Sequence, residues 1–130
     1  SLAGIVAQRL MRVVCKSCAI PYSLTDTELV ELDIKREDTE GRTIFKAVGC
    51  AECLETGYGG RSAIHEIMTV TDDLRDLIIA GADAIALKKQ AMRNGMMTLR
   101  EVAIIKMLQG LTTFEEVMMT TQEDIKRNEL

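Results

Sequence analysis

Four cysteines in two C-x-x-C pairs constrain this chain more than any other feature. The pairs are Cys15-Lys-Ser-Cys18 and Cys50-Ala-Glu-Cys53, and the chain has 4 cysteines in all. Two residues between thiolates let both sulfurs face one ion from a single tight turn, and two such turns complete a tetrahedral shell. The spacing therefore predicts a four-thiolate metal site, the ligand set that Zn²⁺ favours in structural sites.

Other interpretations of the cysteines stay open at this point. Iron uses the same four-thiolate set. Two disulfides need the same even number but belong mainly to secreted chains, and no signal peptide is recognisable here. A redox C-x-x-C goes with a βαβ pattern that this sequence lacks, and free thiols are the last alternative. We expect one structural Zn²⁺ per chain, with no coordination position left for a catalytic water.

Composition narrows the function further. The 130 residues include 16 Lys and Arg against 20 Asp and Glu, for a net charge of −4, and only 3% aromatic residues. This balance argues against a dedicated binder of nucleic acid or of an anionic membrane. No run reaches the roughly 18 apolar residues of a membrane span. The chain has no phosphate-binding G-x-x-x-x-G-K-[ST] motif and no Ser/His/Asp constellation, so we do not expect an enzyme from this chain alone.

Residues 1–70 are predicted to form a tetracysteine zinc-binding subdomain. Apolar residues recur at helical spacing over residues 2–14, which predicts a helix leading into the first cysteine pair. Thr25 with Glu28 opens a short helix. Residues 42–48 and 61–70 have the pattern of strands, with glycine-rich turns between them. Because the chain begins without Met inside an apparent helix, we expect it to be a piece of a longer protein.

Residues 71–120 are predicted to form a C-terminal subdomain of short helices, and the polar residues 121–130 a frayed tail. The fold class is then mainly α with a small zinc-stapled β element (α+β). Four helices are expected to begin at Thr71, near Ala82 or Asp83, at the capping box of Thr98 with Glu101, and at the capping box of Thr113 with Glu116. The second is expected to end at Asn94-Gly95 and the third at Gly110.

Motifs along nearly the whole chain, in order, resemble the family of type II secretion and type IV pilus assembly ATPases. One departure is Met118-Met119, where the family often has an Arg in place of one of the two Met residues. The matching segments are Ser1-Leu2-Ala3-Gly4-Ile5-Val6-Ala7-Gln8-Arg9-Leu10, the two cysteine pairs, Thr56-Gly57-Tyr58, Gly60-Arg61, Ile64-His65-Glu66-Ile67, Gly95-Met96, Thr98-Leu99-Arg100, Gly110-Leu111-Thr112-Thr113 and Glu115-Glu116-Val117.

The resemblance implies the C-terminal part of a cytoplasmic hexameric ATPase that works peripherally at the inner membrane. By resemblance, the zinc ligands are Cys15, Cys18, Cys50 and Cys53, while ATP and Mg²⁺ bind upstream parts of the parent. This part would then not hydrolyse ATP, and Arg9 is a nucleotide-proximal candidate.

Neighbouring ATPase subunits, an inner-membrane platform protein and a membrane anchor are the implied partners. The alternative is a free-standing zinc-ribbon-like adaptor that binds nucleic acid or protein. The net charge of −4 and the few aromatic residues count against its nucleic-acid form.

Overall fold

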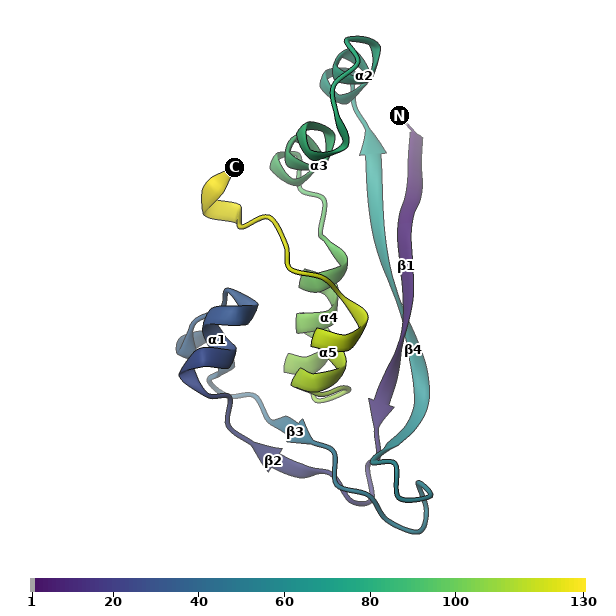
Figure 1. The fold of residues 1–130 in the computed structure, drawn as a ribbon, viewed down its shortest axis with the longest axis vertical. Helices are drawn as coiled ribbons and strands as arrows, with labels where there is room; N and C mark the ends of the chain where they lie inside the picture. Colours follow the sequence, from purple (N-terminus) through teal and green to yellow (C-terminus); the bar gives the residue numbers. More distant parts are fainter. Residues whose placement is uncertain (1) are drawn as a thin grey trace.

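Two long strands form a twisted ribbon that runs along most of the molecule. In the computed structural model, which describes residues 2–130, β1 (Leu2–Val14) pairs antiparallel with β4 (Tyr58–Val70) (Figure 1). The register of the pairing shifts twice, between Ile5 and Ala7 and between Arg12 and Val14. Ser1, the first residue of the N-terminal motif and of the predicted 1–70 subdomain, lies outside the described residues.

The helix predicted over residues 2–14 is wrong, because this segment is β1. The apolar residues that suggested a helical face are largely exposed, Leu2 at 74%. The segment is rich in β-branched residues, which favour strands, and its backbone bonds to β4, a segment far along the chain. A local periodicity cannot reveal a distant partner, and here the partner decides the structure.

A short two-stranded arm follows the first cysteine pair. β2 (Ile20–Tyr22) pairs antiparallel with β3 (Ile44–Lys46), and the helix α1 (Asp26–Leu32) and the 3₁₀ turn η1 (Arg36–Thr39) lie between them. The predicted capping box at Thr25 is confirmed. The predicted strand 42–48 is confirmed in its central residues, whereas β2 is too short to give a sequence signal.

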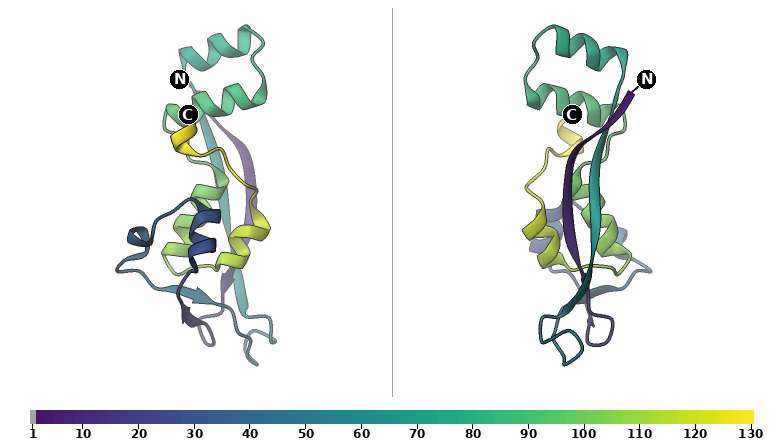
Figure 2. Two further views of the ribbon diagram at one scale, coloured as in Figure 1. Left: turned by 60° about the vertical axis from the view of Figure 1, so that its left-hand side comes forward. Right: turned by 90° about the vertical axis from the view of Figure 1, so that its right-hand side faces the viewer.

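The predicted series of short helices after β4 is confirmed. α2 (Asp72–Ile79) and α3 (Ala84–Arg93) lie at one end of the ribbon, and α4 (Leu99–Leu108) and α5 (Phe114–Thr120) lie alongside it (Figure 2). The observed fold is therefore mixed α+β, with more strand than expected. The four N-caps are Thr71, Asp83, Thr98 and Thr113.

Two separate hydrophobic cores hold these elements. The second, smaller core consists of Leu74, Ala91, Met92 and Met96. Within residues 2–130, no helix has the length and apolar character needed to cross a membrane. The division of the chain at residue 70 stays a prediction, and the first core draws on both sides of it: Met11, Leu24, Leu29, Leu32, Ile44, Ile64, Ala103, Ile104, Met107 and Val117.

The last ten residues make specific contacts, which differs from the frayed tail expected. The guanidinium of Arg127, in the 3₁₀ turn η2 (Arg127–Glu129), donates to the carbonyl oxygens of Met92 at 2.9 Å and Met96 at 2.6 Å. It also pairs with Glu101 at 2.7 Å. A polar sequence suggested fraying, but its charged groups find partners on α3 and α4.

Candidate metal centre

The structure brings all four predicted cysteines together at one end of the ribbon. Cys15 follows β1, and Cys18 lies in the turn that leads to β2. Cys50 and Cys53 lie in the turn between β3 and β4. The four Sγ atoms lie within 4.8 Å of one another. The long gap between the pairs is occupied by the β2–β3 arm and α1, which return the chain to its starting point.

The spacing of the sulfurs fits a tetrahedral ion site. The Sγ–Sγ distance is 3.9 Å between Cys15 and Cys50, 3.8 Å between Cys18 and Cys53, and 3.7 Å between Cys50 and Cys53. Four sulfurs at a Zn–S distance of 2.3 Å form a tetrahedron with an edge of about 3.8 Å. All four cysteines are free, and a disulfide would need about 2.05 Å. The thiols therefore have the geometry of a metal shell and not of two disulfides.

Backbone N–H groups point at the sulfurs. Those of Cys50 and Gly57 donate to Cys53 Sγ at 3.1 and 3.2 Å, and that of Gly49 donates to Cys18 Sγ at 3.3 Å. Such bonds favour a thiolate over a thiol. They also orient ligands in metal sites.

The balance between these N–H groups and burial sets widely different pKa values at Cys53 and Cys18. Burial raises the pKa of Cys53, but the N–H groups of Gly57 and Cys50 outweigh burial and lower it to about 6. At Cys18 the N–H of Gly49 lowers the pKa, but burial and the neighbouring thiols outweigh this and raise it to about 12. Four thiolates at such distances repel one another, so all four ionise together only beside a cation.

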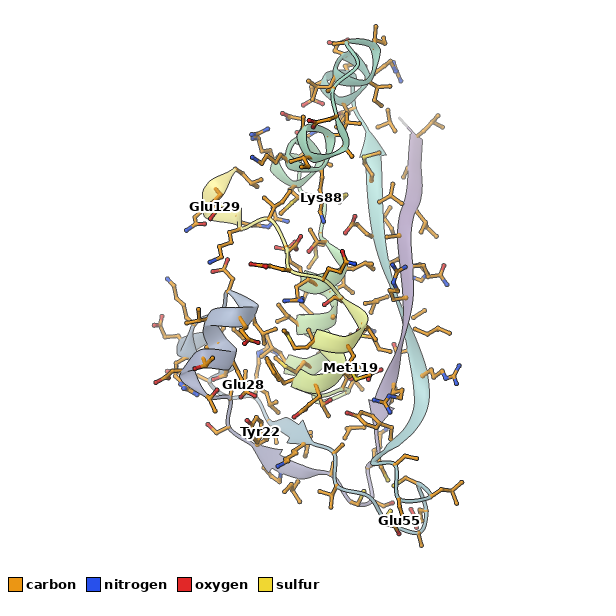
Figure 3. The ribbon with its side chains drawn as sticks, viewed as in Figure 1. Tyr22, Glu28, Glu55, Lys88, Met119 and Glu129 are labelled. Carbon is orange, nitrogen blue, oxygen red and sulfur yellow. The ribbon has the colours of Figure 1, made fainter. Side chains whose placement is uncertain are left out.

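An unusual backbone places these donors. Gly57 has φ +84°, and Leu54 and Glu55 lie in the left-handed region at +56° and +63°, where non-glycine residues are strained. Glu55 is at the outer end of the cysteine turn (Figure 3). The turn folds tightly back on itself, since a Cβ at Gly49 would lie 3.0 Å from the carbonyl oxygen of Glu55. This conformation directs the N–H of Gly57 to Cys53.

Arg12 and Tyr58 connect the cysteine cluster to α5, a role that the sequence did not indicate. The Arg12 guanidinium lies 4.0 Å from the centre of the Tyr58 ring and 2.9 Å from the carboxylate of Glu116. The Tyr58 hydroxyl is 2.8 Å from that of Thr113. Glu116 was predicted to complete a capping box with Thr113. It accepts the backbone N–H of Arg12 instead, and only the Thr113 half of the box forms.

Arg9 lies on β1, away from the cysteine cluster. Its guanidinium donates to the carbonyl oxygen of Gln8 at 2.7 Å, and it borders a cavity of about 290 Å³ that Lys88 and Arg100 also line. Arg100 is buried and donates to Thr121 at 2.6 Å. Three carboxylates, of Glu66, Glu123 and Asp124, line the same cavity, so Arg9 lies in a mixed-charge pocket and not beside the predicted ligands.

The fold and the cluster define an α+β chain with a tetrathiolate site suited to a metal ion. The sequence profile of the family described as "Type II/IV secretion system protein" matches residues 1–119. The chain belongs to this family, which confirms the resemblance drawn from the motifs.

Individual relatives come from both branches named in that description. The chain is 42% identical over 123 residues to the type IV pilus assembly ATPase PilB of Thermus thermophilus and 41% identical over 125 residues to PilB of Myxococcus xanthus. It is 37% identical over 123 residues to the type II secretion system ATPase E of Vibrio cholerae. Each match covers 95% of this chain but only 14%, 22% and 24% of the relative.

Proposed function

We propose that this chain is the zinc-binding C-terminal region of an ATPase that powers type IV pilus assembly or type II secretion. The observation that carries the proposal is the near-tetrahedral set of four free thiols in a chain of this family. Cys15, Cys18, Cys50 and Cys53 are the ligands of one Zn²⁺. The ion supplies a cross-link between the end of β1 and the β3–β4 turn, and a full shell of thiolates leaves no place for a reacting water.

In the parent, this region acts as a structural and interaction module. It carries no phosphate-binding loop, so ATP and Mg²⁺ bind elsewhere and this part does not hydrolyse ATP. The names of the relatives support a place in a pilus assembly or secretion machine, and the proposed location is the cytoplasmic side of the inner membrane. The partners are neighbouring ATPase subunits, a platform protein and a membrane anchor. Residues 1–70 form the zinc subdomain and residues 71–120 the helical one, and Arg9 lies toward the nucleotide-binding part of the parent.

Metal content tests the first half of the proposal. Native mass spectrometry of the chain purified without added metal should show one Zn²⁺, released by acid to leave four reduced thiols. Cys50→Ser should lose the ion, whereas Ala51→Ser, which adds a hydroxyl in the same turn, should keep it. Iron in place of zinc, or a metal-free chain lighter by four hydrogens, would contradict the zinc assignment.

Activity tests the second half. The 130-residue chain mixed with ATP and Mg²⁺ should release no phosphate. In the full-length parent, Cys50→Ser should abolish filament assembly or secretion while nucleotide binding persists, and Ala51→Ser should behave as the unmodified protein. ATP hydrolysis by the isolated chain, or a normally working Cys50→Ser parent, would contradict the proposed role.

A further inference from the structure

A solvent-open groove lies between α1, α4 and the C-terminal residues. Its volume is about 520 Å³, within the range of protein ligand sites. In Figure 3, Glu28 marks α1 and Glu129 marks the C-terminal segment, and both lie on the same side of α4. The apolar side chains that line the groove are Val30, Leu32, Ile34, Met97, Ile104, Ile105 and Ile125.

The two helices expose apolar surface here that their own packing leaves uncovered. On α1, Leu29 and Leu32 face the first core, while Val30 is 70% exposed on the groove side. On α4, Ile104 is buried but its neighbour Ile105 is exposed. α4 is apolar around most of its circumference, a pattern typical of a helix that is covered on all sides. The groove is therefore the side of α4 that lacks a cover among residues 2–130.

Charge at the rim of the groove is predominantly negative. Five carboxylates and three cationic side chains line it. Glu101 is paired with Arg127, and Asp124 with Lys88. The three remaining carboxylates form no ion pair with any described residue. These carboxylates are Glu31, Asp33 and Glu123. Of the lining cations, Lys126 and Arg100 also form none, and Arg100 is buried and donates to Thr121.

We propose that this groove binds a short amphipathic helix of a partner protein, with apolar side chains in the groove and Lys or Arg side chains beside the rim carboxylates. Two helices, α1 and α4, form walls of the groove, and an amphipathic helix that lays its apolar face into such a groove is a recurrent mode of peptide recognition. The acidic rim repels nucleic acid and anionic lipid headgroups, because both carry negative phosphates. The inference goes beyond the proposed function and does not depend on the identity of the metal.

Peptide binding to the 130-residue chain tests the proposal. The probe is a fluorescein-labelled peptide of about twelve residues, roughly 18 Å as a helix, with Leu and Lys at amphipathic spacing. A twin peptide carries Glu in place of Lys. Fluorescence anisotropy should show binding of the Lys peptide that weakens with added salt, and at least tenfold weaker binding of the Glu twin. Equal binding of both peptides overturns the charge argument and with it the proposal.

Variants locate the binding surface. Val30→Ser and Ile105→Ser should each weaken binding about tenfold, and Glu31→Lys severalfold at low salt. The matched control is Ile79→Ser, at an apolar residue 76% exposed on α2, outside the groove. Circular dichroism establishes that each variant is folded. Unchanged binding by Val30→Ser, or equal loss in the Ile79→Ser control, overturns the proposal.

A second copy of the chain is the competing occupant, and sedimentation distinguishes it. The chain should remain monomeric at the concentrations of the peptide titration. A dimer that Val30→Ser dissociates would show that the groove joins two copies, and it would overturn the proposal of a partner helix.

Discussion

At the scale of single residues, Gly57 is where the cysteine turn has the least room. An added Cβ would lie 2.7 Å from the Cβ of Ala47, and φ is +84°. Gly57→Ala should therefore destabilise the chain by about 1–3 kcal/mol. Because the N–H of Gly57 also donates to Cys53, the variant should release metal more readily to a competing chelator. Thermal unfolding and chelator titration measure the two effects.

The control for this substitution is Gly59→Ala. A Cβ at Gly59 meets nothing within 4 Å, and its φ lies outside the left-handed range. The free energy of unfolding of this variant should lie within about 0.5 kcal/mol of that of the unmodified chain. If Gly57→Ala and Gly59→Ala have the same stability and retain metal equally well, the close contact with Ala47 does not restrict which residue can occupy position 57.

Glu116 gives a second prediction at this scale. Its carboxylate is 4% exposed and contacts both the backbone N–H and the guanidinium of Arg12. Glu116→Gln removes the charge from this pair and should cost about 2 kcal/mol, less than a fully buried pair because Arg12 is 42% exposed. Chemical denaturation measures the loss. As a control, Glu115→Gln at the neighbouring exposed position should change the free energy of unfolding little. A loss equal to that of Glu116→Gln would contradict the stabilising role assigned to the Glu116–Arg12 pair.

Residue-level reasoning from the sequence succeeds where the interaction is local. The caps at Thr25, Thr71 and Thr98 involve residues within one helical turn, so the spacing alone predicts them. Glu116 has the same spacing from Thr113, but a distant guanidinium binds its carboxylate. Nothing in the sequence around Glu116 identifies that competitor.

At the scale of elements, the C-terminal segment depends on the pair formed by Glu101 and Arg127. Burial would raise the pKa of Glu101, but the hydrogen bonds from Arg127 and Thr98 outweigh it and lower the pKa below the usual 4.5. The folded chain therefore binds fewer protons at this group than the unfolded chain does. The stability it contributes is present above about pH 4.5 and is lost as the pH falls through the folded value.

Glu101→Gln tests this pH dependence. Glutamine keeps the capping box with Thr98 but not the charge, so near neutral pH the cost should be at most about 1 kcal/mol, as for exposed ion pairs. Between pH 7 and pH 3, the free energy of unfolding should fall less steeply in the variant than in the unmodified chain. Parallel pH curves for both would show that the pair with Arg127 contributes nothing.

β1 shows why an element can be assigned to the wrong class. Its apolar residues fit a helical face, and no local feature contradicts that pattern. The strand forms because β4 supplies a partner over its full length and because Ile64 and Met11 share one core. The helices after β4 were predictable since each carries its own capping residue, whereas β1 is defined only by a contact distant in sequence.

At the scale of the whole molecule, the sequence predicts the cysteine site but not the way it joins the body. Two C-x-x-C pairs suffice for the first, because tight turns and thiolate chemistry leave few alternatives. Besides the Arg12–Glu116 pair, the connection includes the Cys15 N–H bonded to the Gly57 oxygen at 2.8 Å, the Val14 N–H bonded to the Leu111 oxygen at 2.9 Å, and the Tyr58 hydroxyl bonded to Thr113. Metal binding in such sites is largely folding free energy, about 10–16 kcal/mol in small zinc peptides.

Metal removal should therefore unfold the molecule unevenly. With the proposed Zn²⁺ withdrawn by a chelator, hydrogen exchange should accelerate at both cysteine turns and the β2–β3 arm. It should accelerate next in α5, which the Tyr58–Thr113 and Arg12–Glu116 contacts connect to the turns. The amides of α2 and α3 should keep their protection, because their core of Leu74, Ala91, Met92 and Met96 is separate from the first core. Loss of protection at the same rate throughout would mean that the two cores unfold as one unit. Exchange unchanged by a chelator that demonstrably removes the ion would mean that the metal does not hold the fold.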